Sequence, residues 1–266
     1  MGLGLGNINA NRSQAKVTHF TSAMHFDGTA DFEQAADSNH TTFGNGTNDL
    51  DFSIIVWFKV DTVGGGQANP LILKANEYMI NVSANALGII LYDNDTDNYR
   101  QWVTGGILEA NKWYCALFVA NGDGSGGIAA GEMTLYLNGS SLTNGSGLTA
   151  SDEGTYAAMH NKGNHRTGSD GSNLLDGLVA QIAILNLPIG ANAAARIYNN
   201  GVPTNLSHAH NIAAANLKAY WAFGNTAGDT IAAVQDQGQA GVNMAQGTAS
   251  KQPVLITGAN VRTGVI

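Results

Sequence analysis

The sequence is poor in cysteine, in charged residues and in basic clusters. Its 266 residues include one cysteine, 12 lysines and arginines, and 20 acidic residues, which give a formal net charge of -8. A single cysteine, Cys115, allows no internal disulfide, so the chain gives no sign of an oxidising compartment. The basic residues are scattered along the chain, and this distribution argues against nucleic-acid binding through neutralisation of phosphates.

No segment is suited to a membrane or to standard export. Residues 1–14 have neither the basic start nor the apolar stretch of a signal peptide. No apolar run approaches the roughly 20 residues that span a bilayer, so we expect no membrane partner. If the protein works outside a cell, release by lysis as part of a virus particle would place it there.

Familiar catalytic motifs are absent as well. The sequence contains no G-x-S-x-G elbow, no H-E-x-x-H motif and no P-loop. Cys115 lies in the middle of the apolar run WYCALFVA, where we expect a buried, unreactive thiol and not a nucleophile. These absences indicate a protein that is not an enzyme.

Glycine and apolar residues are plentiful. Glycine accounts for 34 residues and apolar residues for 44% of the chain, a composition typical of a turn-rich β protein and not of a disordered one. Many short apolar or alternating segments separated by turns predict an all-β, antiparallel β-sandwich. The predicted strands cover residues 22–26, 31–34, 50–60, 70–74, 78–82, 86–92, 99–103, 112–120, 132–137 and 178–186. Residues 144–173, rich in Ser, Gly and Asn, are predicted to be loops.

One short helix is predicted after the last strand of the sandwich. Asp176-Gly177 forms a turn before that strand, and Asn138-Gly139 forms a tight hairpin turn earlier in the chain. Residues Ala191 to Tyr198 are alanine-rich and favour a helix. Asn199-Asn200-Gly201 supplies a left-handed stop, and Pro203 prevents any continuation.

The chain divides into three parts, with extended arms at both ends. Residues 1–21 are rich in Gly and Asn and form an N-terminal arm, and residues 22–203 form the sandwich. Residues 204–266 form a C-terminal segment in which 217–224 and 253–256 are strand-like. We expect one or two strands of this segment to pack on the sandwich or on a neighbouring subunit.

Several segments, taken in order, resemble a known family of jelly-roll domains. The opening strand and turn of that family is similar to MHFDGTADF (24–32), and a central strand is similar to DFSIIVWFKV (51–60). Later strands match NKWYCALFV (111–119) and LYLNGS (135–140), and the closing strand and helix match LLDGLVAQIAILN and RIYNNGVPTNLS. A segment that trails the domain in many phage members resembles LKAYWAFGNTAGDTIAAVQDQ. The chain thus resembles the laminin-G-like, concanavalin A-like lectin jelly-roll domains of bacteriophage and marine-virus structural proteins.

This resemblance implies both a fold and a role. The fold is a concanavalin A-like jelly roll, and the role is that of a non-enzymatic phage virion protein, either a capsid decoration protein or part of a fibre or spike. The implied partners are other virion proteins, such as major capsid or tail proteins, together with further copies of the chain and polysaccharide. The alternatives are a carbohydrate-binding module and a glycoside hydrolase of the laminarinase-like fold.

The hydrolase alternative needs a particular strand motif. Related hydrolases carry Glu-x-Asp-x-x-Glu, which places two carboxyl groups about 5–5.5 Å apart over one cleft. This chain contains no such motif. In addition, Gln181 stands where the closing strand of the family often has an acidic residue.

Carbohydrate recognition needs an exposed aromatic side chain and polar groups that fix the sugar hydroxyls. Trp102, near a turn, is the candidate for the aromatic side chain, and the neighbouring Arg100 is the candidate for a polar group. The alternative for Trp102 is packing in the core. Trp57 and Trp113 lie in core-like strands and are expected to pack. Trp221 is a candidate anchor of the C-terminal segment on the sandwich.

Calcium is the one cofactor that the resemblance suggests, at loops on one edge of the sandwich. Asp27 and Asp31 near the first turn are the candidate ligands, with an Asx-turn as the alternative. Asp93-x-Asp95-x-Asp97 begins like a calcium loop but lacks the glycine and the final acid of an EF-hand, which favours a solvated turn. His208 and His210 have the spacing of metal ligands, without a nearby Cys or acidic residue.

Overall fold

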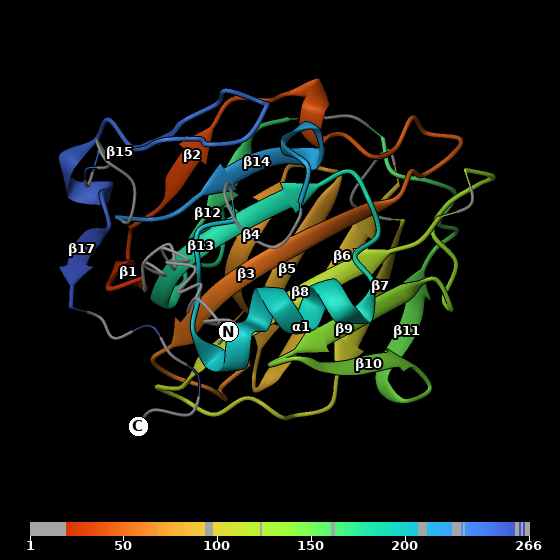
Figure 1. The fold of residues 1–266 in the computed structure, drawn as a ribbon, viewed down its shortest axis with the longest axis horizontal. Helices are drawn as coiled ribbons and strands as arrows, with labels where there is room; N and C mark the ends of the chain where they lie inside the picture. The colour runs from red at the N-terminus through yellow and green to blue at the C-terminus, as the bar shows by residue number, and fades with distance from the viewer. Residues whose placement is uncertain are drawn as a thin grey trace, which may run out of the picture.

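Two layers of antiparallel strands pack face to face in the computed structural model of the chain (Figure 1). The structure describes residues 20–66, 68–93, 98–122, 124–160, 163–206, 212–224, 230, 232–258, 261 and 263. Hydrogen bonds link all these strands into one continuous sheet that folds back on itself. The predicted β-sandwich is therefore confirmed, with a single α-helix among the described residues.

The first layer consists of β1 (Ser22–Asp27), β3 (Phe52–Val60), β8 (Trp113–Ala120), β9 (Met133–Leu137), β10 (Ser140–Asn144), β13 (Asp176–Leu185), β14 (Leu217–Trp221) and β17 (Val254–Thr257). β13 is central: it pairs with β3 along one side, and with β1 and then β14 along the other. β3 continues through β8 and β9 to β10, while β17 pairs with the far side of β1.

The second layer consists of β2 (Glu33–Ala35), β4 (Ala68–Lys74), β5 (Tyr78–Ser83), β6 (Ala86–Tyr92), β7 (Tyr99–Thr104), β11 (Gly147–Glu153), β12 (His165–Thr167), β15 (Ala233–Val234) and β16 (Met244–Ala245). Its strands run in the order β15-β16-β2-β12-β4-β5-β6-β7-β11. A short contact between β10 and β11 joins the two layers.

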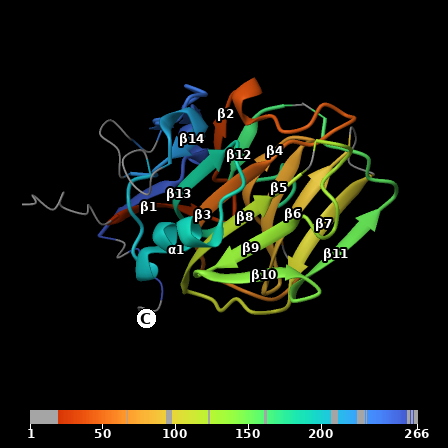
Figure 2. The ribbon, with the colours of Figure 1, turned by 45° about the vertical axis from the view of Figure 1, so that its right-hand side comes forward.

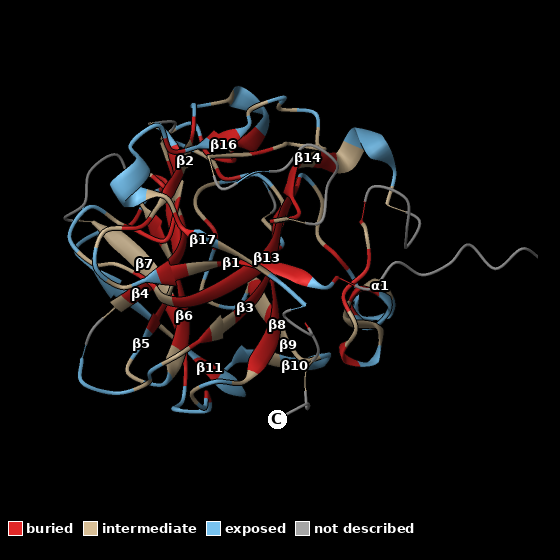
Figure 3. Ribbon diagram, turned by 90° about the vertical axis from the view of Figure 1, so that its left-hand side faces the viewer, coloured by how far each residue is buried: buried red, intermediate tan, exposed pale blue. Residues whose placement is uncertain are grey.

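Strand β3 shows why the sequence forms a sandwich with one layer covered on both faces. Its residues alternate between two apolar clusters, with Ile54 and Val56 between the layers and Ile55 and Trp57 on the outer side of the first layer. Because both faces are covered, the strand is apolar at every position except Ser53 and Lys59 and needs no polar alternation. Figure 3 shows the same burial along β8 and β13, which lie on either side of β3.

Helix α1 (Ala191–Tyr198) covers the outer face of the first layer, in front of β3, β8 and β9 in Figure 1. Its bounds are the predicted ones. Ile197 is buried in the outer cluster, and the ring of Tyr198 stacks on Trp57 with centroids 6.2 Å apart. The predicted stop is confirmed, because Asn199 and Asn200 both have positive φ, at 46° and 52°.

The C-terminal segment belongs to the sandwich and is not an appendage to it. It supplies four strands instead of the expected one or two, because β15 and β16 are only two residues long and carry no readable pattern. β14, β16 and β17 pair with β13, β2 and β1 of the same chain. Trp221 and Phe223 lie in the cluster between the layers, so the predicted boundary at residue 203 divides one core. Trp221 anchors the segment as expected, and its indole N–H donates to the carbonyl of Val242 at 3.0 Å.

Two predicted features differ in detail, and a third is confirmed. Residues 144–173, predicted as loops, contain β11, β12 and the end of β10. Asp176-Gly177 opens β13 instead of forming a turn, and Gly177 is required there because a Cβ atom would lie 2.3 Å from the carbonyl oxygen of Lys59 on β3. The Asn138-Gly139 hairpin turn is confirmed by positive φ at both residues.

Some residues named in the sequence predictions are outside the described part of the chain. They are residues 1–19 of the N-terminal arm, Asp95, Asp97, His208 and His210. Cys115 is buried as expected, and burial raises the pKa of its thiol. None of the described helices combines the length and the apolar character that crossing a bilayer requires.

Candidate functional site

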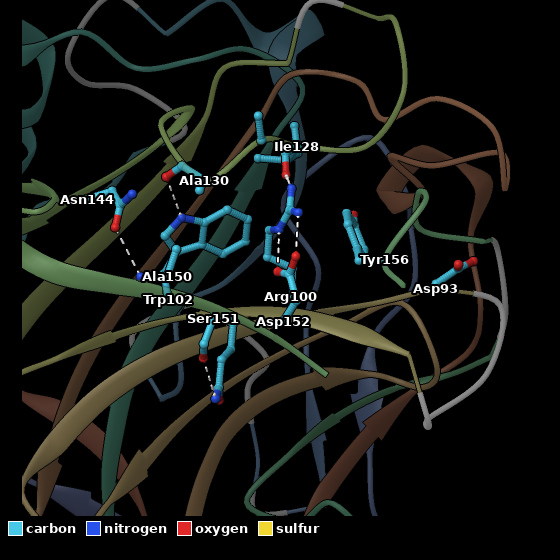
Figure 4. Close-up of polar contacts among 12 residues, drawn as sticks. Asp93, Arg100, Trp102, Ile128, Ala130, Asn144, Ala150, Ser151, Asp152 and Tyr156 are labelled. Carbon is cyan, nitrogen blue, oxygen red and sulfur yellow. Dashed lines mark hydrogen bonds and ion pairs between the residues drawn. The ribbon is translucent and has the colours of Figure 1, made fainter. Parts of the chain in front are cut away.

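Trp102, the predicted sugar-stacking residue, is fully buried. It lies on β7 with its ring in the cluster between the layers, and its indole N–H donates to the carbonyl of Ala130 at 2.9 Å (Figure 4). A ring without exposed surface cannot stack on a soluble sugar. The carbohydrate-binding prediction for Trp102 is therefore wrong, and the alternative of core packing is confirmed.

Arg100 is partly buried and contacts several other groups of the protein. Its guanidinium makes a bidentate ion pair with Asp152 on β11, with both N···O distances 2.6 Å, and donates to the carbonyl of Ile128 at 2.9 Å (Figure 4). It also lies over the ring of Tyr156, 5.3 Å from the centroid. The hydrogen bonds from Arg100 lower the pKa of the Asp152 carboxyl. Arg100 thus joins β7 to β11 and an adjacent loop, and its role in sugar binding stays a prediction.

Asp27 and Asp31 lie in an Asx-turn, which the sequence offered as the alternative to calcium binding. The Asp27 carboxylate accepts hydrogen bonds from the Thr29 hydroxyl at 2.6 Å, from the Thr29 amide at 2.8 Å and from the Ala30 amide at 3.3 Å. These bonds, the Thr29 hydroxyl first, lower the pKa of Asp27. Burial raises the pKa of Asp31, whose carboxylate accepts from the Asp27 amide. Both side chains therefore serve the turn, and calcium binding by them stays a prediction.

A different group of ligand atoms gathers beside this turn. His25, Asp61 and Asp176 come from β1, the end of β3 and the start of β13, and one ligand atom of each lies within 4.8 Å of the others. Asp61 is already paired, with His25 Nε2 at 2.9 Å and Lys59 Nζ at 3.4 Å. The Thr62 hydroxyl donates to Asp176 at 3.2 Å. Contacts of the protein's own side chains therefore already engage Asp61 and Asp176 at this edge.

A second polar group lies inside the sandwich. Lys74 and Glu77 are fully buried and paired at 2.6 Å, and the Phe43 amide donates to Glu77 at 2.7 Å. Burial raises the pKa of Glu77 to about 7, against the opposing effect of Lys74. Burial also lowers the pKa of His165, which bonds the Thr41 hydroxyl at 2.7 Å, to about 3. These groups hold residues 41–43 onto β4 and β12 and have no contact with solvent.

The second layer has an outer face, formed by β4 to β7 and β11. This face is on the opposite side of the sandwich from α1 (Figure 2). Its central row crosses seven strands, because each residue is the direct cross-strand partner of the next. The row comprises Gln34, Arg166, Leu73, Met79, Ile90, Gln101 and Ser151. Their inward neighbours, such as Ile80, Ile89 and Trp102, lie in the core, so pleating turns the row outward. We call this row, with the flanking Tyr92 and Tyr99, the open face.

Two tyrosines flank the row where β6 turns towards β7. Tyr92 and Tyr99 are cross-strand partners, with ring centroids 6.0 Å apart in an edge-to-face arrangement. Both side chains are half-buried, so each presents part of its ring to solvent. Burial first, and then the charge of Asp170, raises the pKa of Tyr92 to about 12. Its hydroxyl therefore stays protonated at neutral pH and can act as a hydrogen-bond donor.

A hollow of about 320 Å³ lies beside Tyr92. Leu73, Met79 and Tyr92 supply apolar and aromatic lining, and a loop from residue 170 to 173 supplies polar lining. Asp170 shapes this loop, because its carboxylate accepts from the Ser172 and Asn173 amides and from the Asn173 side chain. An apolar floor with polar walls matches a ligand that has both apolar and hydroxylated faces.

Two other shallow hollows lie at the loop that precedes β3. They share Asn39, Thr42 and Leu50, whose side chain is 58% exposed. Neither combines a pair of exposed tyrosines with a row of polar side chains, so the open face is the stronger candidate.

The tyrosines of the open face could have been found from the sequence. In β7 the residues alternate, so Tyr99 and Gln101 lie on one face and Arg100 and Trp102 on the other. The inward phase is set in β6, where Leu87, Ile89 and Leu91 lie in the core and alternate with Gly88, Ile90 and Tyr92. Extending that phase across the β6–β7 hairpin would have placed Trp102 inside and Tyr99 outside.

The sequence profile of the concanavalin A-like lectin/glucanases superfamily, Laminin_G_3, matches residues 27–193. This range covers more than half of the chain, including the open face and most of the two layers. The chain belongs to this superfamily. No curated protein matches it.

Several solved structures are similar to this chain. A protein from Bacteroides ovatus ATCC 8483, provisionally assigned as carbohydrate-binding, is similar with a TM-score of 0.60 and 12% identity over 90% of this chain. The chain spans 60% of the length of that protein. The carbohydrate-binding module CBM40 of a Ruminococcus gnavus sialidase, bound to α2,3-sialyllactose, has a TM-score of 0.44 and 8% identity over 68% of this chain and 100% of its own. A heptameric SAP-like pentraxin from Limulus polyphemus has a TM-score of 0.44 and 14% identity over 67% of this chain and 82% of its own.

Proposed function

We propose that the chain is a non-enzymatic carbohydrate-binding module and that the open face binds a polysaccharide. The observation that supports this proposal is the combination of half-exposed Tyr92 and Tyr99 with an apolar floor and flanking amide and hydroxyl groups. Sugar rings offer apolar C–H faces to aromatic side chains and hydroxyls to polar ones. Membership of a superfamily that includes lectins agrees with this proposal.

The distribution of carboxyl groups argues against hydrolysis. A glycosidase places two carboxyl groups on either side of the bond that it cleaves. Glu33 and Glu77 are fully buried, so neither can reach a polysaccharide in solvent. The Asp170 carboxylate is occupied by donors of its own loop, and the central row carries no acidic residue.

A glycan array followed by calorimetry tests the proposal. We expect the wild-type chain to bind at least one class of polysaccharide, and the variants Tyr92→Ala and Tyr99→Ala each to weaken binding about tenfold, because each removes a stacking surface. Tyr136→Ala is the matched control: Tyr136 lies on β9 and packs against the outer cluster of the first layer. It should change the affinity less than about twofold. Wild-type protein that binds no glycan, or full binding by the double tyrosine variant, would refute the proposal.

We propose a virion as the setting of this binding, as a capsid decoration or fibre component in contact with other virion proteins. Support comes from the resemblance of the closing and trailing segments to phage members and from the low charged fraction of 12%. Adhesion to glycans and attachment to a particle are compatible roles. Mass spectrometry of purified particles should detect the chain at a fixed ratio to the capsid protein, and its absence from them would exclude this setting.

A further inference from the structure

Arg166 places a cation in the central row of the open face. It lies on β12, and its direct partner on β4 is Leu73, which lines the hollow beside Tyr92. The distance between paired strands, about 4.8 Å, therefore separates the two backbones. One guanidinium nitrogen of Arg166 lies 3.6 Å from the position that a Cβ atom on Gly171 would take, in the loop whose residues 170, 172 and 173 line the hollow.

The guanidinium of Arg166 is positioned but not neutralised. It lies over the ring of Phe32, 5.1 Å from the centroid, and one of its N–H groups donates to the Gln34 side chain at 3.2 Å. Among the described residues, no carboxylate lies within 4.0 Å of it. Of its five N–H donors, most thus remain for a ligand.

A second cation shares the same aromatic ring. Lys251 is exposed and its ammonium lies 5.8 Å from the centroid of Phe32, again without an ion-pair partner in the described part of the chain. Neither Glu33 nor Asp170 forms an ion pair with these two cations in the described part of the chain. Glu33 is buried inside the sandwich, and the Asp170 carboxylate accepts three hydrogen bonds from its own loop.

We propose that the polysaccharide bound by the open face is acidic and that Arg166 binds its carboxylate or sulfate group. This inference rests on the proposed function. The planar fork of an arginine matches both anions through two parallel hydrogen bonds, which an ammonium cannot make. The contacts with Phe32 and Gln34 fix the fork in advance, so little side-chain freedom is lost on binding. Lys251 adds a longer-range attraction for the same anion.

Binding of three polymers separates this inference from the proposed function. Polygalacturonate carries carboxylates, dextran sulfate carries sulfate esters, and laminarin is neutral. We expect the wild-type chain to bind at least one acidic polymer at least tenfold more tightly than laminarin, with an affinity that falls as salt rises. The acidic polymer that binds more tightly identifies the anion.

Variants assign the effect to Arg166. Arg166→Gln should weaken binding of the acidic polymer at least tenfold and leave laminarin binding within twofold, and Arg166→Lys should restore only part of the loss. Arg196→Gln, an exposed arginine on α1, is the matched control and should change nothing. Thermal melting of each variant confirms that it is folded, and Arg166→Lys carries the test if Arg166→Gln is not.

The outcomes are distinguishable. Equal or tighter binding of laminarin, or an acidic polymer whose affinity Arg166→Gln leaves unchanged, overturns the acidic-ligand inference while the carbohydrate-binding proposal stands. A chain that binds none of the polymers and no glycan on an array overturns both.

Discussion

Replacing Glu33 should make the protein more stable at neutral pH, by an amount that grows as the pH rises. The side chain of Glu33 is fully buried. Among the described residues, neither of its carboxyl oxygens has a hydrogen-bond partner. Burial raises its pKa from 4.5 to about 8. The folded chain therefore keeps a proton on Glu33 up to about pH 8, whereas the unfolded chain releases it near pH 4.5.

The sign and size of the effect follow from these two values. Protonated Glu33 gives the folded chain its full stability below about pH 4.5. The free energy of unfolding then falls as the pH rises towards 8. One pKa unit corresponds to about 1.4 kcal/mol, so the shift corresponds to at most about 5 kcal/mol. Relaxation and water entry around a buried charge reduce this, and we expect about 2–3 kcal/mol between pH 5 and pH 8.

The assay compares wild type with Glu33→Gln, which has the same shape and does not titrate. Urea unfolding at pH 5, 6, 7 and 8 gives the free energy of unfolding for both chains. The difference between them isolates Glu33, because Glu77 and His165, which also titrate, are present in both. We expect the variant to gain about 2–3 kcal/mol relative to wild type from pH 5 to pH 8. A difference that does not change with pH, or one that falls as pH rises, would show that Glu33 is charged or solvated in the folded state.

Further substitutions test the packing that supports the open face. Arg100→Gln should lower the free energy of unfolding by about 1–2 kcal/mol, because it leaves Asp152 unpaired, and should leave glycan affinity unchanged; a tenfold loss in calorimetry would instead identify Arg100 as a binding residue. Gly177→Ala should cost about 2 kcal/mol or more in urea unfolding, because its Cβ atom would lie 2.3 Å from the Lys59 carbonyl oxygen, and a neutral effect would mean that β3 and β13 can separate. Trp221→Ala should cost about 3–5 kcal/mol and lower the thermal midpoint of the whole chain in one transition; a separate early transition would instead mean that the C-terminal segment unfolds by itself.

The strands that could be predicted from the sequence are those with an apolar face. β8 is apolar throughout and β3 and β13 are nearly so, and each was predicted within two residues of its bounds. β10 and β11 were missed because their side chains are mostly exposed and polar, and pairing at the edge of a layer, not burial, makes them strands. Patterns of apolar residues cannot reveal such strands.

The site was harder to predict than the fold. Trp102 and Tyr99 are three residues apart in one strand, and only the phase of the pleat decides which of them meets solvent. That phase is a property of the whole layer, because the partners of β7 fix it. Arg166 gave still less signal, since its place beside Leu73 depends on the pairing of β12 with β4, whose partner residues are 91 and 93 positions apart in the sequence.

The methionine methyl groups offer the most direct test of ligand binding at the open face. Met79 lines the hollow of the open face, whereas Met24, Met133, Met159 and Met244 lie in the cluster between the layers. In a titration of ¹³C-methyl-methionine-labelled protein with a bound oligosaccharide, Met79→Leu identifies the Met79 signal. We expect the Met79 resonance to shift in proportion to saturation while the four core signals stay in place. A Met79 signal that does not move at saturation would contradict binding at the open face.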